Sequence, residues 1–278
     1  MAGSDWDRRV LPVCVGAVLA TALVAEVLVV LLRFRPPGEP FPLWPIASLV
    51  FLLTSALESA RRFIMASPST RGVMLAGAGQ GWDYCYACQT HVPPRCSHCF
   101  TCNVCVLRRD HHCLLLGQCL GYQNYRYFLC LLLYGSVALL YGSLLNANVV
   151  WMLLEEGGFA YKILLLMLPW LMFLMGQVSF VTFVYAFVTD ICVVGFLFCI
   201  SFLLFHSLLA LRGQTTKEWF EGNRRYHLGW RNNLRQIMGK RWLLASLTPF
   251  ITSHLPGDGI TFQTSSPKTE VLSRSPSN

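Results

Sequence analysis

Residues 85–119 read CYACQTHVPPRCSHCFTCNVCVLRRDHHCLLLGQC and hold eight cysteines and four histidines. This density of nitrogen and sulfur donors exceeds what a soluble core needs and is typical of a segment that binds metal. Hydrophobic stretches long enough to cross a bilayer lie on both sides of it. The sequence therefore predicts a zinc-binding domain at a membrane.

The composition favours a multi-pass membrane protein over a soluble domain, because the 278 residues are 54% hydrophobic and 13% charged, with a mean hydropathy of +0.49. About 20 consecutive apolar residues cross a bilayer as a helix. Five stretches qualify: 10–32, 43–65, 128–154, 163–188 and 191–211. The first is too long for the apolar core of a signal peptide, so we expect it to be a retained helix.

The formal net charge of +8 comes from basic residues that flank the hydrophobic stretches, so it does not indicate a nucleic-acid partner. Arginines and lysines gather in the cysteine-rich segment and after residue 211, whereas the loop 155–162 carries Glu155 and Glu156 with Lys162 as its one cation. Positive residues stay cytoplasmic, which predicts a cytoplasmic cysteine-rich segment and C-terminal region and a luminal loop. Cytosolic thiols stay reduced, so we expect metal ligands or catalysts and no disulfides.

An even number of crossings must join the two cytoplasmic regions, yet three hydrophobic stretches lie between them. We expect 163–188 not to be a full crossing, because Pro169 and Gly176 interrupt it and only Thr189 and Asp190 separate it from the next stretch. A re-entrant or luminal-side helix would satisfy both hydropathy and parity. The alternative is that this stretch spans and a neighbour does not.

The expected fold is an all-α polytopic membrane protein, a bundle of four spanning helices with a fifth re-entrant stretch and a cytoplasmic double-zinc, cysteine-rich domain. Its expected parts are 1–65 with the first two spanning helices, 66–127 with the zinc domain, 128–212 with the remaining spanning helices and a luminal loop at 155–162, 213–255 as a basic cytoplasmic region, and 256–278 as a tail. The tail is rich in Ser, Thr, Pro and Gly, a composition typical of disorder.

The cysteine spacing predicts structural zinc, which takes four nitrogen or sulfur ligands in a tetrahedron. Three Cys-x2-Cys steps, at 85–88, 99–102 and 102–105, are followed by Cys119. Two sites need eight donors, so two histidines complete them and four of the twelve candidates are spare. Spacing alone does not name the spare residues.

Cys113 is the candidate nucleophile, because it stands beside Asp110, His111 and His112. A thiol with a neighbouring imidazole and an orienting carboxylate has the makeup of an activated nucleophile. The alternatives are that Cys113 is a ninth ligand or an inert thiol.

These residues resemble the DHHC-type protein S-acyltransferases, the palmitoyltransferase family. The positions that fit its spacing are Cys85, Cys88, Pro93, Arg95, His98, Cys99, Cys102, Cys105, Asp110, His111, His112, Cys113, Cys119, Gly121, Asn124 and Phe128. A second family signature, Thr-Thr-x-Glu, stands at 215–218, and the resemblance covers about 43–235. The chain departs from the family at Leu114-Leu115 (usually Pro-Trp), Gln118 (usually Asn), Val92 and Ser97, which bears on rate and acyl-chain preference more than on reaction class.

The resemblance implies two interleaved structural zinc sites, one of Cys85, Cys88, His98 and Cys105 and the other of Cys99, Cys102, His112 and Cys119. It implies Cys113 as the nucleophile and His111 as its base, with Asp110 orienting His111. Thr216 would position Asp110, supported by Thr215 and Glu218, although a Thr-Thr-x-Glu sequence can also simply cap a helix.

The implied donor is a long-chain acyl-CoA such as palmitoyl-CoA, with its head group expected near Arg95, Arg108 and Arg109. The implied acceptors are proteins with cytoplasmic juxtamembrane cysteines, and the implied location is an endomembrane, the Golgi or the endoplasmic reticulum. Two other interpretations stay open: a zinc-stabilised membrane scaffold that transfers nothing, and a membrane-anchored RING-like ubiquitin ligase.

Overall fold

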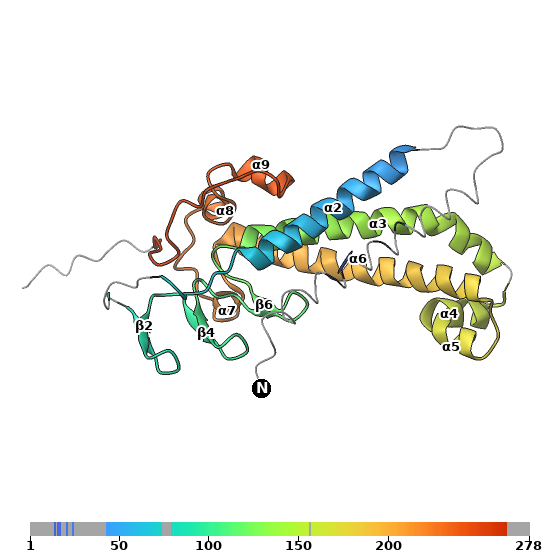
Figure 1. Cartoon of the computed structure of the whole chain (residues 1–278), viewed down its shortest axis with the longest axis horizontal. Helices are drawn as coiled ribbons and strands as arrows, with labels where there is room; N and C mark the ends of the chain where they lie inside the picture. Colours follow the sequence, from blue (N-terminus) through green and yellow to red (C-terminus); the bar gives the residue numbers. More distant parts are fainter. Residues whose placement is uncertain are drawn as a thin grey trace, which may run out of the picture.

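The computed structural model describes residues 43–73, 79, 81–155 and 157–265, together with Cys14, Gly16, Ala17, Thr21 and Val24 (Figure 1). The first hydrophobic stretch, 10–32, therefore lies almost wholly outside the described residues. The end of the predicted tail, 266–278, also lies outside them.

Three long helices form the bundle: α2 (Leu43–Met65), α3 (Tyr125–Glu155) and α6 (Phe180–Arg212). Each contains a segment long and apolar enough to cross a membrane, with a mean hydropathy of 1.5 in α2, 2.0 in α3 and 2.4 in α6. Helix α3 packs against both α2 and α6, and the three run side by side (Figure 1). They account for three of the four predicted spanning helices.

The stretch 163–188 is divided in the structure and forms no single long helix. Helices α4 (Phe159–Met167) and α5 (Pro169–Leu174) are too short to cross a bilayer, and the chain turns at Gly176 with φ 68° before α6 begins. Both short helices lie at the end of the bundle opposite the strands (Figure 1). Helix α3 thus leads away from the strands and α6 returns to them, which agrees with the predicted parity.

The expected break at Thr189 and Asp190 is wrong, because both residues lie inside α6. Neither side chain removes a backbone hydrogen-bond donor, as a proline would, so an apolar helix continues through them. The true interruptions are the Leu168–Pro169 junction and Gly176. The 33-residue α6 is about 50 Å long, and it therefore absorbs the second half of the stretch 163–188.

The cysteine-rich domain corrects the expected all-α class, because it consists of three antiparallel hairpins. Their strands are β1 (Asp83–Cys85) with β2 (Thr90–Val92), β3 (Ser97–Cys99) with β4 (Val104–Val106), and β5 (His112–Cys113) with β6 (Gln118–Cys119). This polar segment lacks the 3.6-residue apolar period that a helix needs to bury one face. Instead, short strands and tight turns bring the cysteine and histidine side chains of this segment together in groups.

Backbone contacts hold the hairpin domain at the end of α2 and the start of α3. The chain after α2 lies along β4, where Leu107 N–H donates to the Pro68 carbonyl. The buried Asn124 side chain accepts from Gly121 N–H and donates to the Cys119 carbonyl, 2.9 Å in each case. These bonds fix the last hairpin relative to the first turn of α3.

The C-terminal region folds back onto the same end of the bundle as α7 (Thr216–Phe220), α8 (Trp230–Met238) and α9 (Trp242–Leu247) (Figure 1). Part of the predicted disordered tail is packed: Gly257 N–H donates to the Tyr122 hydroxyl at 3.1 Å, and the Phe262 ring lies 4.8 Å from the Arg95 guanidinium. The ordered contacts therefore continue beyond residue 255.

Candidate functional site: two metal groups and a free cysteine

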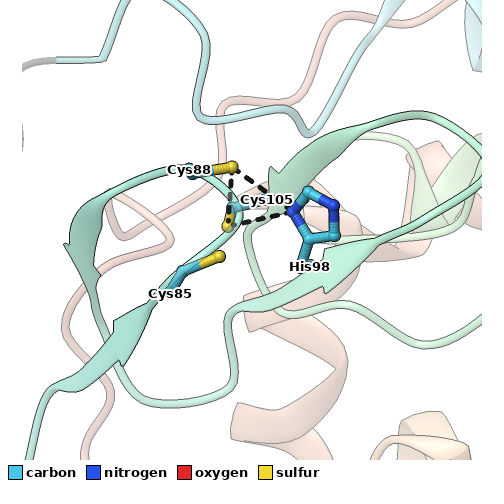
Figure 2. A group of neighbouring side chains, drawn as sticks. All are labelled: Cys85, Cys88, His98 and Cys105. Carbon is cyan, nitrogen blue, oxygen red and sulfur yellow. Dashed lines mark hydrogen bonds between the residues drawn. The ribbon is translucent and has the colours of Figure 1, made fainter.

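Two groups of four side chains each bring their donor atoms within 4.8 Å of one another. The first is Cys85, Cys88, His98 and Cys105, and the second is Cys99, Cys102, His112 and Cys119. Figure 2 shows the first group, whose thiols and imidazole converge from two neighbouring hairpins. All the cysteines are free thiols, so no disulfide competes with metal binding. Both groups could hold a metal ion.

The donor distances fit tetrahedral zinc. Zinc bonds of 2.3 Å to sulfur and 2.0–2.1 Å to nitrogen give tetrahedral edges of about 3.8 Å between sulfurs and about 3.6 Å between sulfur and nitrogen. In the first group, Cys88 Sγ lies 3.3 Å from His98 Nδ1 and 3.5 Å from Cys105 Sγ. In the second, His112 Nδ1 lies 3.3 Å from Cys102 Sγ and 3.7 Å from Cys119 Sγ. Both sets match structural zinc, with no ligand position left for substrate.

The hairpins explain why the two groups interleave. Each of the first two ends its first strand on a cysteine and carries a second cysteine three residues later in a four-residue turn: Cys85 and Cys88, then Cys99 and Cys102. The other two ligands are a cross-strand pair from the next hairpin, His98 opposite Cys105 and His112 opposite Cys119. Each group therefore links one turn to the following hairpin.

The third hairpin repeats this turn without its second cysteine. Cys113 ends the strand β5 as Cys85 and Cys99 end theirs, but Leu116 occupies the third turn position. Gly117 follows with φ 61°, the left-handed geometry that Gln89 and Asn103 adopt at φ 50° in the other turns. No fourth hairpin follows in the described part of the chain. Cys113 therefore lies outside both metal groups and packs with Leu116 against the apolar cluster at the end of the bundle.

Asp110, His111 and Thr216 form a hydrogen-bonded chain beside Cys113. His111 Nδ1 lies 2.8 Å from Asp110 Oδ2, and Asp110 accepts from Thr216 N–H at 2.9 Å and from the Thr216 hydroxyl at 2.7 Å. The Asp110 side chain is fully buried. With Nδ1 of His111 held by Asp110, its Nε2 remains available for the thiol of Cys113, two residues along the chain.

Burial and hydrogen bonding oppose each other at this pair. Burial lowers the pKa of His111, but hydrogen bonds with Asp110 and Cys113 outweigh it and raise that pKa to about 9. For Asp110, burial raises the pKa. The hydrogen bonds from His111 and Thr216 outweigh burial and hold the pKa of Asp110 below its ordinary value. An imidazolium paired with a carboxylate is thereby favoured at neutral pH, and this cation stabilises a neighbouring thiolate.

The Thr-Thr-x-Glu signature both caps a helix and contacts the site. The Thr215 hydroxyl accepts from Glu218 N–H, and Glu218 accepts from Thr215 N–H at 2.8 Å, a complete capping box for α7. Thr216 then reaches Asp110. The two alternatives for this sequence are therefore both realised, by adjacent threonines.

Replacing Thr216 with valine removes one hydrogen bond to the Asp110 carboxylate without changing the side-chain shape. We expect the acylation of Cys113 that the family resemblance implies to slow by about 10- to 100-fold, since a hydrogen bond to a charged group is worth about 1.5–3 kcal/mol. Thr215→Val is the matched control and should instead lower stability by about 1 kcal/mol, through loss of the cap. Single-turnover acylation rates and thermal unfolding separate the two; equal effects of both substitutions on rate would contradict the positioning role.

Arg95 joins the hairpin domain to the C-terminal region. Its guanidinium, 2% exposed, forms two hydrogen bonds to Glu218 at 2.7 and 2.8 Å and a third to the Gly213 carbonyl. The Tyr226 ring lies 4.2 Å from it. These contacts give the guanidinium a structural role, and its expected role in binding a CoA head group stays a prediction.

The other two arginines of that prediction are also engaged. Arg108 is buried, lies 5.0 Å from the Tyr125 ring centre and donates to the Gln214 carbonyl at 3.5 Å, so its described partners are also within the protein. Arg109 is half-buried, and its backbone N–H donates to the Arg95 carbonyl at 3.0 Å. Basic residues near a reactive motif can therefore be structural, and sequence alone does not separate the two uses.

Removing the Arg95 side chain should destabilise the protein strongly. Arg95→Ala leaves the Glu218 carboxylate buried without its partner, which we expect to cost about 3–5 kcal/mol. Lys217→Ala, in the same helix as Glu218, breaks only an exposed 3.7 Å pair with Glu221 and should cost at most about 1 kcal/mol. Thermal unfolding of both purified variants provides the comparison, and equal losses of stability would refute the structural role of Arg95.

His206, a histidine inside the last apolar stretch, is a site residue that the sequence did not predict. Its buried ring lies 5.4 Å from the His111 ring between centres and 5.0 Å from Phe128, and its Nδ1 lies 3.0 Å from the Tyr125 hydroxyl. The available signal was its position in the last apolar stretch, five residues before the end at Leu211. That position could not show that α6 packs against His111.

An apolar cavity of about 440 Å³ lies beside this histidine pair. Its lining residues are His111, Ser201, Phe202, Phe205, His206 and Thr216. The cavity thus extends from His111 along the aromatic residues of α6. A hydrocarbon chain would be favourably buried there.

Comparison with known proteins agrees with this geometry. The family model described as DHHC palmitoyltransferase matches residues 79–223. The proteins named "Probable palmitoyltransferase ZDHHC24" are 48% identical over 92% of this chain and 90% of the relative in Danio rerio, and 50% identical over 95% of both in Homo sapiens. "Protein S-acyltransferase 8" of Arabidopsis thaliana is 29% identical over 59% of this chain and 44% of its own. Since the matched segment holds both metal groups, Cys113 and Thr216, the chain belongs to the DHHC palmitoyltransferase family.

Proposed function

We propose that this integral membrane protein is a protein S-acyltransferase that moves a long-chain acyl group, such as palmitoyl, from acyl-CoA to cysteines of other proteins through an acyl-Cys113 intermediate. The observation that carries the proposal is the position of Cys113, which lies outside both metal groups and two residues after the His111 that Asp110 and Thr216 hold. Family membership and the names of the relatives support the reaction class.

In the first half-reaction, Sγ of Cys113 attacks the carbonyl carbon of the acyl-CoA thioester. A new carbon–sulfur bond forms, the bond to the CoA sulfur breaks, and His111 passes the thiol proton to the departing CoA thiolate. Asp110 keeps Nδ1 of His111 occupied, so Nε2 is the atom that accepts and then donates this proton.

In the second half-reaction, a cysteine of the acceptor protein attacks the acyl-Cys113 thioester. His111 takes the proton from the acceptor thiol, and Cys113 leaves as the thiolate that the imidazolium stabilises. One thioester replaces another in each half-reaction, so the net free-energy change is small. The side chains therefore need mainly to position and deprotonate the thiols.

The metal groups are assigned a structural role as zinc sites. Zinc would supply cross-links that a short polar segment needs in place of a hydrophobic core. His112 belongs to the second group and His111 does not, so two adjacent histidines have different roles. The ligands thus hold β5, and with it Cys113, at the end of the bundle.

We further propose a four-span bundle, completed by the stretch 10–32, with the hairpin domain and Cys113 on the cytoplasmic side of an endomembrane, the Golgi or the endoplasmic reticulum. Support comes from the basic residues of the hairpin end and from the acidic loop at 155–162 at the far end of the bundle. The proposed partners are the lipid bilayer, acyl-CoA and proteins with juxtamembrane cysteines.

Intact-mass spectrometry of the purified protein after incubation with palmitoyl-CoA tests the function. A hydroxylamine-labile palmitoyl mass on Cys113, chased onto a cysteine peptide with release of the enzyme, is the expected result. Two bound zinc ions without any acyl adduct would favour the scaffold. Discharge of ubiquitin from a loaded conjugating enzyme would favour the RING-like ligase.

A further inference from the structure

The turn that follows the nucleophile carries two leucines with highly exposed side chains. Leu114 is 84% exposed and Leu115 is 69% exposed. They belong to the four-residue turn between β5 and β6, where the family usually has Pro-Trp. Each methylene kept in water costs about 0.8 kcal/mol relative to an apolar environment, so two adjacent exposed leucines call for an apolar partner.

The same turn lies against the spanning helices. Leu116 packs on the apolar cluster that includes Phe63 of α2 and Leu129 and Leu132 of α3. Gln118, at the other end of the turn, donates to the Phe63 carbonyl at 3.0 Å. Leu132 lies about 10 Å along α3 from its first residue, at the rise of an α-helix. The turn is therefore fixed beside the segments that cross the membrane.

The other two turns provide an internal comparison. Their exposed aromatic residues, Tyr86 at 86% and Phe100 at 88%, are as open as Leu114, but neither turn contributes a residue to the apolar cluster shared with α2 and α3, as the third turn does with Leu116. In Figure 1, the hairpins of β2 and β4 point away from the long helices, whereas the turn of β6 lies next to their ends. Of the three turns, the one with the nucleophile is in position to meet the bilayer.

A second apolar surface places the lipid boundary near the same level of α3. Helix α9 lies along α3, where the Cys130 thiol donates to the Ala245 carbonyl and the Tyr134 hydroxyl to that of Leu247. Its exposed leucines are Leu243, Leu244 and Leu247, and the exposed Lys240 and Arg241 precede them. Leucines directed into lipid below a rim of basic residues are typical of a helix at a membrane surface.

We propose that Leu114 and Leu115 insert into the hydrocarbon of the adjacent leaflet and anchor the β5–β6 turn there. This surface continues the lipid-facing surface of α2 and α3, so the bilayer is its occupant. The anchor holds Cys113, one residue away, at the depth where the thioester of a membrane-dissolved acyl chain lies. The insertion goes beyond acyl transfer, because it concerns the membrane contact of the turn whether or not Cys113 is acylated.

Photo-crosslinking in the full-length protein tests the insertion. The photoreactive residue p-benzoylphenylalanine replaces Leu115 in one protein and Phe100 in the other, each reconstituted in phosphatidylcholine bilayers. We expect irradiation to add the mass of one phospholipid at position 115 with at least about tenfold higher yield than at position 100. Zinc content, measured first, confirms that both proteins have kept their hairpins.

Equal phospholipid yields at the two positions would overturn the insertion. So would crosslinks from position 115 that join it mainly to another segment of this chain or to a second copy, since protein would then cover the leucines. Acylation of Cys113 is measured on the unmodified protein, so the insertion and the proposed function can fail independently.

Discussion

Replacing Cys113 with serine is expected to reduce acyl transfer by on the order of 10⁴-fold or more while zinc content and stability stay unchanged. The substitution removes the proposed nucleophile. A serine hydroxyl is a far weaker nucleophile than a thiolate, and it would need a stronger base to become reactive. Zinc should remain because Cys113 belongs to neither metal group. Intact-mass analysis of the acyl adduct and elemental analysis of zinc on the same sample provide both measurements.

Cys96→Ser is the matched control, because Cys96 also lies in the hairpin domain outside both metal groups. Burial and then the neighbouring Cys85 and Cys88 raise the pKa of Cys96 to about 12, which keeps this thiol protonated and unreactive. We expect the Cys96→Ser protein to form the adduct at the normal rate. Zinc loss on Cys113→Ser would mean that this sulfur is a metal ligand, and the proposed mechanism would then be incorrect.

The sequence predicted the donor types and the total of eight ligands, but geometry was needed to divide them. Cys102 and Cys105 have the spacing of a chelating pair, yet they serve different groups, because Cys102 lies in a turn and Cys105 in β4. Which histidine joins which cysteines depends on the strand register, that is, on which residues lie opposite each other in a hairpin. The spacing of the cysteines does not reveal this register. Family resemblance supplied both sets, and the donor distances bear them out.

The site contacts that the sequence did not predict share one physical cause, which is long-range pairing. Arg95 lies near the reactive motif in sequence, but its partner Glu218 is more than one hundred residues away, and that contact buries the charge. His206 lies on α6 and reaches His111 only because α6 packs behind the last hairpin. Hydropathy predicted the long helices well, since the backbone hydrogen bonds of a helix join residues close in sequence. Side-chain partners depend instead on how the helices pack against the hairpin domain.

Loss of metal from the second group should disable the protein as completely as loss of the nucleophile, but by unfolding. The Cys99→Ser substitution removes one of four ligands, and each structural zinc contributes about 10–16 kcal/mol of apparent binding free energy. Without it, the short β5–β6 pairing loses its metal cross-link to the second hairpin, and we expect His111 and Cys113 to lose their positions. We expect zinc content to fall and acylation to disappear.

The damage should stay confined to the hairpin domain. The long helices α2, α3 and α6 satisfy their backbone hydrogen bonds internally, so far-ultraviolet circular dichroism should change little while limited proteolysis cuts within residues 81–122. Cys96→Ser should resist the protease, because it spares all eight ligands. A Cys99→Ser protein that kept its zinc, its protease resistance and its acyl adduct would show that Cys99 is not a metal ligand and would contradict the assignment of the second group.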